Sequence, residues 1–179
     1  MTITISVTES SILAALRAFL LSILPAGTEV VRGQVNRVPP PKGSNYLVMT
    51  PLMRTRLATN VHSYSDPFPD PGSSQSIQQS TQVSIQLDVH GPAAGDNAQM
   101  IMMLLRDDLA CQSFTGSGFA IQPLYTSEPR QMPFVTGEDQ YEDRWTLDAE
   151  LQANPVITID QQFAGTLKAE IIEIEATYG

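Results

Sequence analysis

The sequence predicts an α+β fold, a mostly antiparallel β-sheet with two α-helices packed on one face. Apolar residues recur at helical spacing in two segments, residues 12–23 and 98–109. Apolar and polar residues alternate over 82–90 and again over 141–151, as in strands with one buried face. A doubly wound parallel sheet is disfavoured, because it would need more than two helices, alternating with the strands.

The composition is that of one folded domain, residues 1–179. With 42% hydrophobic and 16% charged residues, the chain does not have the composition of a disordered acidic tail. Nineteen acidic residues against ten basic ones give a net charge of -9, which disfavours tight binding of nucleic acid but allows DNA to pass an acidic surface. The longest apolar stretch, 12–24, is interrupted by Arg17 and Ser22 and is too short to span a bilayer.

The N-terminal elements follow from local signals. Capping residues at 8–11 precede the first helix, and Pro25 to Gly27 end it. Strands are predicted over 29–36 and 46–52, separated by the proline run at 39–41. Pro51 predicts an edge or a bulge in the second of these strands, and the stretch that follows it, up to Tyr64, has weak strand character.

Residues 65–76 are predicted to form a flexible loop, because the segment is polar and broken by prolines. Its length is unusual for a plain connection inside a compact domain. Two interpretations stay open at this point: a loop that contacts another protein, and a loop that is merely mobile.

The C-terminal half continues with the strand over 82–90, which Gly91 and Pro92 end. Pro92 or Asp96 begins the second helix, whose apolar stripe runs to Leu109. Strands are then predicted over 119–125, 141–151 and 167–178. A short segment, 156–159, is expected to extend the sheet, and a bulge at 171–172 accounts for a slip in the last alternation.

Few residues suggest chemistry. The histidines are His62 and His90, and the chain has one cysteine, Cys111, which the helical stripe predicts to be a buried, inert thiol. The spacing of these residues predicts no metal site and no cofactor site. His90 is expected to form hydrogen bonds at the surface or at a sheet edge. A catalytic pairing of His90 with Cys111 or with the acidic residues is the basis of a weaker alternative, a small hydrolase.

The acidic run from Glu138 to Asp143 is interpreted as a solvated face or as a patch for a partner subunit. Arginines elsewhere supply possible positive counterparts. The predicted interface residues are Asp66, Phe68, Asp70, Arg130, Glu138, Asp139, Glu142 and Arg144.

Five phrases of the sequence together resemble the neck and tail terminator proteins of tailed bacteriophages. They are QVNRVP at 34–39, IQLDVHG running into AGDNA at 85–98, LLRD at 104–107, PLYTSEPR at 123–130 and YEDRW at 141–145. Each phrase alone mixes turn and strand signals, and their order and spacing carry the resemblance. It extends over residues 34–151.

The resemblance implies an α+β structural subunit of the virion, with no catalytic residues, that assembles in the host cytoplasm into a ring, often a hexamer. Such a ring caps the tail tube, stops its polymerisation and docks to head-completion or connector proteins. The expected partners are therefore further copies of the chain, the tail-tube protein and the connector, with neither a membrane nor tightly bound nucleic acid. The alternatives are another connector, tail-tube or baseplate subunit, the small hydrolase, and a ligand-binding module with a concave apolar pocket.

Overall fold

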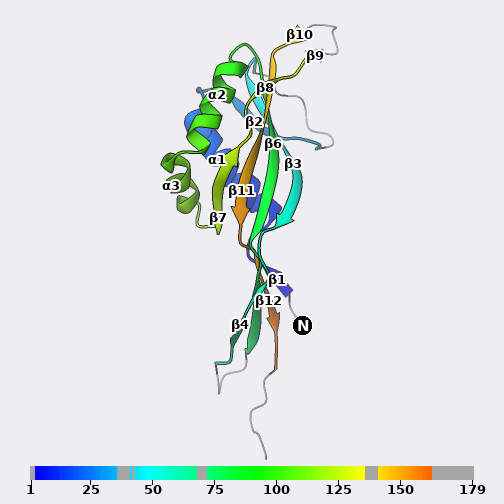
Figure 1. The fold of residues 1–179 in the computed structure, drawn as a ribbon, viewed down its shortest axis with the longest axis vertical. Coiled ribbons are helices and arrows are strands. Elements are labelled where there is room, and N and C mark those ends of the chain that lie inside the picture. Colours follow the sequence, from blue (N-terminus) through cyan, green and yellow to red (C-terminus); the bar gives the residue numbers. More distant parts are fainter. Residues whose placement is uncertain (1–2, 36–40, 42, 68–71, 136–140, 163–179) are drawn as a thin grey trace, which may run out of the picture.

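The computed structural model of the protein describes residues 3–35, 41, 43–67, 72–135 and 141–162 (Figure 1). The described residues form three helices and two main sheets, which confirms the predicted α+β class with mostly antiparallel pairing. The helices are α1 (Glu9–Ile23), α2 (Ala94–Leu105) and α3 (Asp108–Gly116). Within the described ranges, no helix is long and apolar enough to cross a membrane.

The larger sheet, called the main sheet, has the strand order β2-β3-β6-β11-β7. Its strands are β2 (Glu29–Arg32), β3 (Tyr46–Arg56), β6 (Thr81–His90), β11 (Arg144–Ala153) and β7 (Ile121–Thr126). Short β8 (Arg130–Gln131) also pairs with β11, and β9 (Phe134–Val135) pairs with β10 (Tyr141–Glu142). The pairing of β2 with β3 is parallel, and the other described pairings are antiparallel.

The hydrophobic core lies between the main sheet and the three helices, which cover one of its faces (Figure 1). Alternate residues of the central strands, among them Met49, Leu87 and Leu147, are buried against this helical layer. Phe19 of α1 and Phe114 of α3 meet there with their ring centroids 5.9 Å apart. Burial of these large side chains is the main source of stability for the sheet and helix layers.

The first helix forms where the sequence predicts it. The Thr8 side chain accepts a hydrogen bond from the backbone N–H of Ser11 (3.2 Å), which satisfies one of the free donors of the first turn. The expected bulge in β3 is also confirmed, because its register with β6 shifts between Pro51 and Met53.

The second predicted helix is two helices in the structure. At Asp107 the backbone turns extended, and the Asp107 carboxylate accepts a hydrogen bond from the Leu109 N–H (3.3 Å), so that Asp107 caps a new helix. The apolar stripe therefore stops at Leu105. Leu109 is 48% exposed, and the prediction of a buried Cys111 is wrong, because α3 turns Ala110 and Phe114 toward the core instead.

The smaller sheet, called the arm, projects from one end of the main sheet (Figure 1). Its strand order is β1-β12-β5-β4, with β1 (Ile3–Ile5), β12 (Val156–Asp160), β5 (Ser74–Gln78) and β4 (Val61–Ser65). The arm extends the hairpin of the main sheet, because β3 leads into β4 and β5 leads into β6.

Two predictions change as a consequence. The segment 65–76, expected to be a loop, contains the end of β4 and the start of β5, which leaves residues 66–73 as the connection. Residues 156–159 do not extend the main sheet, because β12 pairs with β5 and β1 in the arm. The strand predicted over 167–178 lies outside the described residues.

Gly91 forms the tight break between β6 and α2. Its φ is +103°, a region that favours glycine, and a Cβ at this position would lie 1.9 Å from the Ser44 carbonyl oxygen. Its N–H donates to the Asp143 carbonyl oxygen (3.0 Å). The turn therefore accepts no larger residue without moving the chain at Ser44.

We expect the substitution Gly91→Ala to lower the free energy of unfolding by roughly 2–4 kcal/mol, because it adds both backbone strain and a clash with backbone. Chemical denaturation followed by circular dichroism measures this change. Gly116→Ala is the matched control, since a Cβ there meets nothing within 4 Å, and it should stay within about 1 kcal/mol of the unsubstituted chain. Equal effects of the two substitutions would contradict the prediction.

Candidate interaction surfaces

The face of the main sheet that is turned away from the helices is polar but largely buried. Ser84, Asp88 and His90 of β6 alternate with the core residues of the strand, which confirms the predicted alternation. These three side chains are nevertheless buried, and His90 is only 5% exposed. The expectation of a histidine at the surface or at an edge is therefore wrong, because β3 and β11 flank β6 on both sides.

A cluster of five side chains, called the His90 cluster, ties these strands together: Tyr46, Asp88, His90, Glu142 and Arg144. The His90 ring stacks on Tyr46 with centroids 4.4 Å apart, and its Nδ1 lies 3.3 Å from Glu142 Oε1. The Tyr46 hydroxyl donates to Glu142 Oε2 (3.4 Å). The Arg144 guanidinium donates through Nε (3.1 Å) and Nη2 (2.8 Å) to Asp88 Oδ1.

The environment of the cluster shifts two pKa values. Burial, together with the negative charge of Glu142, raises the pKa of Tyr46 to about 12. Burial lowers the pKa of His90 below its ordinary value of 6.5, and Arg144 acts in the same direction, while Glu142 and Asp88 oppose the shift. His90 is thus held in its neutral form near neutral pH.

The cluster brings together one of the two catalytic pairings considered for a hydrolase and not the other. Glu142 lies beside His90, but the His90 imidazole is buried, and Cys111 belongs to α3, which packs on the opposite face of the main sheet. In the part of the chain that the structure describes, no three His, Cys, Asp and Glu side chains are placed to hold a metal ion. The contacts of the cluster join side chains from β3, β6, β10 and β11.

The structure brings three of the predicted interface residues to this face of the main sheet. Glu142 and Arg144 belong to the His90 cluster, and exposed Arg130 of β8 lies 3.6 Å from Asp148 Oδ2. Asp66 lies at the other end of the molecule, beyond β4, where it accepts a hydrogen bond from the Ser73 hydroxyl (2.6 Å). Phe68, Asp70, Glu138 and Asp139 lie outside the described residues.

The arm has one apolar and one polar face. Residues paired across antiparallel strands point to the same face, so the register of β1, β12, β5 and β4 assigns every side chain. The apolar arm face carries Ile3, Ile5, Ile77, Ile157, Ile159 and Tyr64, together with His62 and Gln75. The polar arm face carries Thr4, Ser63, Ser65, Ser74, Ser76, Gln78, Thr158 and Asp160, together with Val61 and Val156.

Much of the apolar arm face is exposed, including Ile3 at 63% and Tyr64 at 59%. A groove at its base joins Ile5, Ile77 and Ile157 to the side chains of Arg54 and Arg56. The register of β3 with β6 pairs Arg54 with Val83 and Arg56 with Thr81, so these arginines continue the core-facing side of β3 toward the arm.

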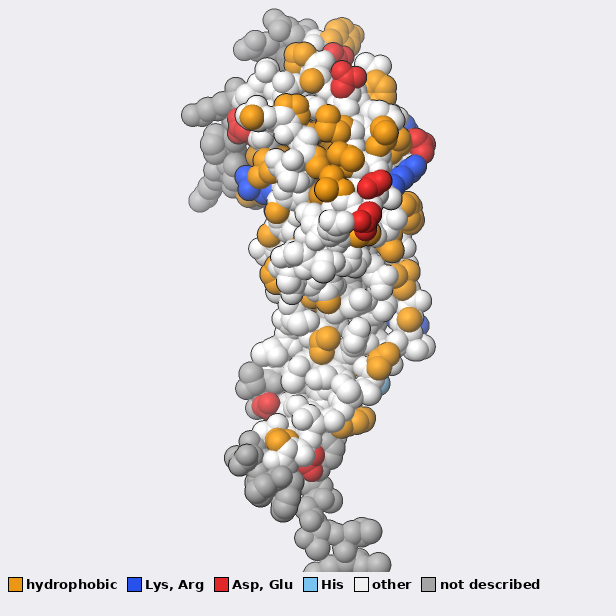
Figure 2. All heavy atoms as spheres, turned by 90° about the vertical axis from the view of Figure 1, so that its left-hand side faces the viewer, with side chains coloured by type: hydrophobic (Ala, Val, Ile, Leu, Met, Phe, Trp, Pro, Cys, Tyr) orange, Lys and Arg blue, Asp and Glu red, His pale blue; other side chains and the backbone are white. Residues whose placement is uncertain are grey.

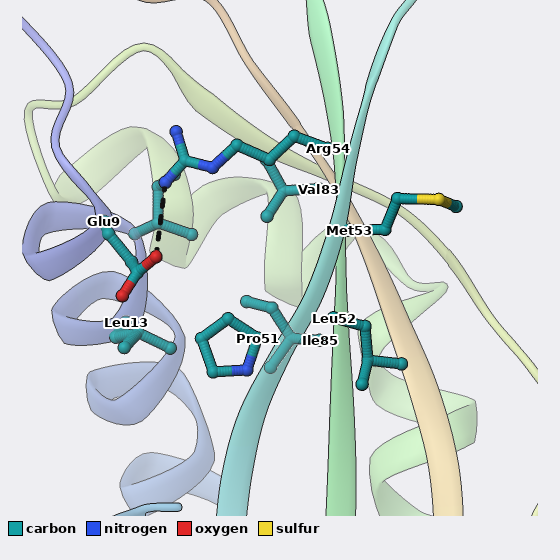
Figure 3. A pocket seen from close by; sticks show the side chains of 9 residues that line it. Glu9, Leu13, Pro51, Leu52, Met53, Arg54, Val83 and Ile85 are labelled. Atoms are coloured by element: carbon teal, nitrogen blue, oxygen red, sulfur yellow. Dashed lines mark ion pairs between the residues drawn. The ribbon is translucent and has the colours of Figure 1, made fainter. Parts of the chain in front are cut away.

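A second groove lies between the start of α1 and the bulge of β3 (Figure 3). Pro51 points toward α1, whereas Leu52 and Met53 point to the other side of the strand and are exposed. Glu9 at the helix start forms ion pairs with Arg32 and, at 3.8 Å, with Arg54. Two arginines thus share one carboxylate next to the base of the arm.

The helical layer has exposed apolar side chains of its own (Figure 2). Met103 of α2 and Leu109 of α3 are exposed, and so are the carboxylates of Asp107 and Asp108 between them in sequence. We call these four residues, where α2 ends and α3 begins, the helix corner. It combines apolar side chains with negative charge.

Sequence reasoning did not find the arm. The alternation of Ile3 with Ile5 and of Ile157 with Ile159 was the available signal. Each segment is too short to predict a partner strand, and β1 and β12 come from near opposite ends of the chain.

Comparison with known proteins identifies the family. The sequence matches the family model described as "Phage neck terminator protein" over residues 10–177, which is most of the chain. A search of curated proteins finds no match.

The buried His90 predicts a pH dependence of stability. Because the pKa of His90 is lower in the folded than in the unfolded chain, its contribution is fully present above about pH 6.5 and is lost as the pH falls toward the folded pKa. We expect His90→Gln to flatten the decline in the free energy of unfolding between about pH 7 and pH 5.5. Urea titrations at several pH values measure it, and exposed His62→Gln is the control that should keep the original slope.

Proposed function

The chain belongs to the phage neck terminator protein family, and on that basis we propose that it closes the head-proximal end of the tail as a ring. Membership of the family makes it a structural component of the phage virion that interacts with other head or tail proteins. In our proposal the ring, with a hexamer as the expected form, stops polymerisation of the tail tube and joins the tail to the head.

The arm is the structural feature that best supports the proposed ring. A sheet with one apolar face, whose outer strands among the described residues are β1 and β4, projects from the main sheet, and much of that face is exposed. Apolar sheet faces of this kind are normally covered by another layer. The arm and the outer surface of the helical layer are two different exposed surfaces of the subunit. Two such surfaces are suited to head-to-tail contacts around a ring.

The proposed partners are further copies of the chain, the tail-tube protein and a head-completion or connector protein, with assembly in the host cytoplasm. The net charge of -9 supports a lumen that DNA passes without tight binding. We propose that the chain acts as one α+β domain. Exposed Asp66 and Arg130 remain proposed contact residues.

The main alternative is a tail-tube subunit, which would polymerise into stacks and not stop at one ring. An enzymatic role has less support, because the family is structural, the His90 imidazole beside Glu142 is buried, and Cys111 lies on the opposite face of the main sheet. The His90 cluster is fully explained as an internal tie between strands.

We expect the purified chain, alone or with tail tubes as a template, to form closed rings that do not stack. Light scattering over a concentration range and electron microscopy of the same samples measure this. Long tubes formed by the chain alone would favour the tube subunit. A monomer at every concentration, even with tail tubes present, would contradict the proposal.

A further inference from the structure

We propose that the apolar arm face is the docking surface for a second copy of the chain, and that it packs on the helix corner of that copy. The inference rests on the proposed ring and names the surfaces that would form its lateral contact.

The two faces of the arm differ in side-chain composition, and one of them is more apolar than expected of a face in contact with water. The polar arm face consists mainly of serine, threonine and glutamine side chains, as expected of a face in water. The opposite face carries five isoleucines in neighbouring register positions, with His62, Gln75 and Tyr64 along the β4 side. A contiguous apolar patch on a soluble protein marks an interaction site.

None of the three helices in the described part of the chain extends over this face. The helical layer covers the main sheet, and α1 begins at Glu9, after β1 has already paired in the arm. A helical layer supplied by a neighbouring copy would therefore continue, over the arm, the layering that the main sheet already has.

The charges at the two surfaces are complementary. Arg54 and Arg56 line the groove at the base of the apolar arm face. Arg54 reaches Glu9 only at 3.8 Å, and both arginines are exposed. At the helix corner, exposed Asp107 and Asp108 directly precede exposed Leu109. In the proposed contact, the isoleucines and arginines of one copy would face Met103, Leu109 and the two aspartates of the other, so that apolar side chains meet apolar ones and opposite charges lie close together.

The two surfaces lie on different parts of the subunit, so the contact is head-to-tail. A head-to-tail contact repeated by rotation closes into a ring, whereas a contact of one patch with itself gives a dimer. The proposal therefore predicts cross-links between the arm of one copy and α3 of the next.

Native Cys111 allows a direct test, since it is exposed on α3, the helix that begins at the helix corner. Ile157→Cys places a second thiol on the apolar arm face, and Thr158→Cys places it on the polar arm face of the same strand. With a short bis-maleimide we expect covalent oligomers from the Ile157→Cys chain well above the level of the Thr158→Cys and unsubstituted chains. Adding Cys111→Ser to Ile157→Cys should abolish them.

Three outcomes of this experiment overturn the inference. Cross-linking that survives Cys111→Ser means that arms pack on arms. Cross-linking that appears only after removal of residues 163–179 means that the C-terminal segment covers the face in the intact chain. Rings that form while Ile157→Cys gives no more cross-linking than Thr158→Cys place the lateral contact elsewhere, and in that case the proposed function stands without the inference.

A charge substitution gives an independent readout. Ile157→Asp should raise the concentration needed for ring formation by about tenfold or more, because it puts an unpaired charge into the contact. Thr158→Asp, on the polar arm face, should change it by less than about twofold. Circular dichroism checks that both variants fold. Equal ring formation by the two variants overturns the inference, and an unsubstituted chain that forms neither rings nor cross-linked oligomers overturns the proposed ring as well.

Discussion

The antiparallel pairing of β3 with β6 is the constraint on which the rest of the molecule depends. It runs from Tyr46 opposite His90 to Arg56 opposite Thr81, interrupted by the bulge after Pro51. The same two segments of chain then pair again as β4 and β5 in the arm. One hairpin therefore supplies the centre of the main sheet and the projection beyond it, and it fixes the position of the arm relative to the helices.

Burial on both faces of β6 makes this register specific. A slip of one residue would exchange the two faces of a strand, and here it would move Asp88 into the hydrophobic core and Leu87 into the polar cluster. Asp88 in its native place is paired with Arg144 and also accepts hydrogen bonds from Gln86 (2.9 and 3.0 Å). Buried polar groups are tolerated where such partners exist, so the His90 cluster specifies the register as well as stabilising it.

The sequence was sufficient for elements whose periodicity is long and unbroken. α1, β6 and β11 lie where the patterns predict them, and the bulge of β3 follows from a proline that cannot donate a hydrogen bond. The break between α2 and α3 was not predicted, because the apolar spacing continues across it. In the structure Asp107 adopts an extended backbone and caps α3, which ends the first of these two helices. Pairing between distant segments was missed as well, since no local pattern shows that Ile3 lies opposite Ile159 or that Glu142 lies beside His90.

The arm could contact another subunit in two ways, by pairing along a strand edge or by packing through its apolar face. Free sheet edges invite strand addition without limit, but the outer strands of the arm, β1 and β4, are only three and five residues long. Edges this short offer few backbone hydrogen bonds to an added strand, while the face beside them offers a row of isoleucines. Packing through the face is therefore favoured over pairing through the edge. In the ring that we propose, such packing is repeated around an axis and ends when the last subunit meets the first.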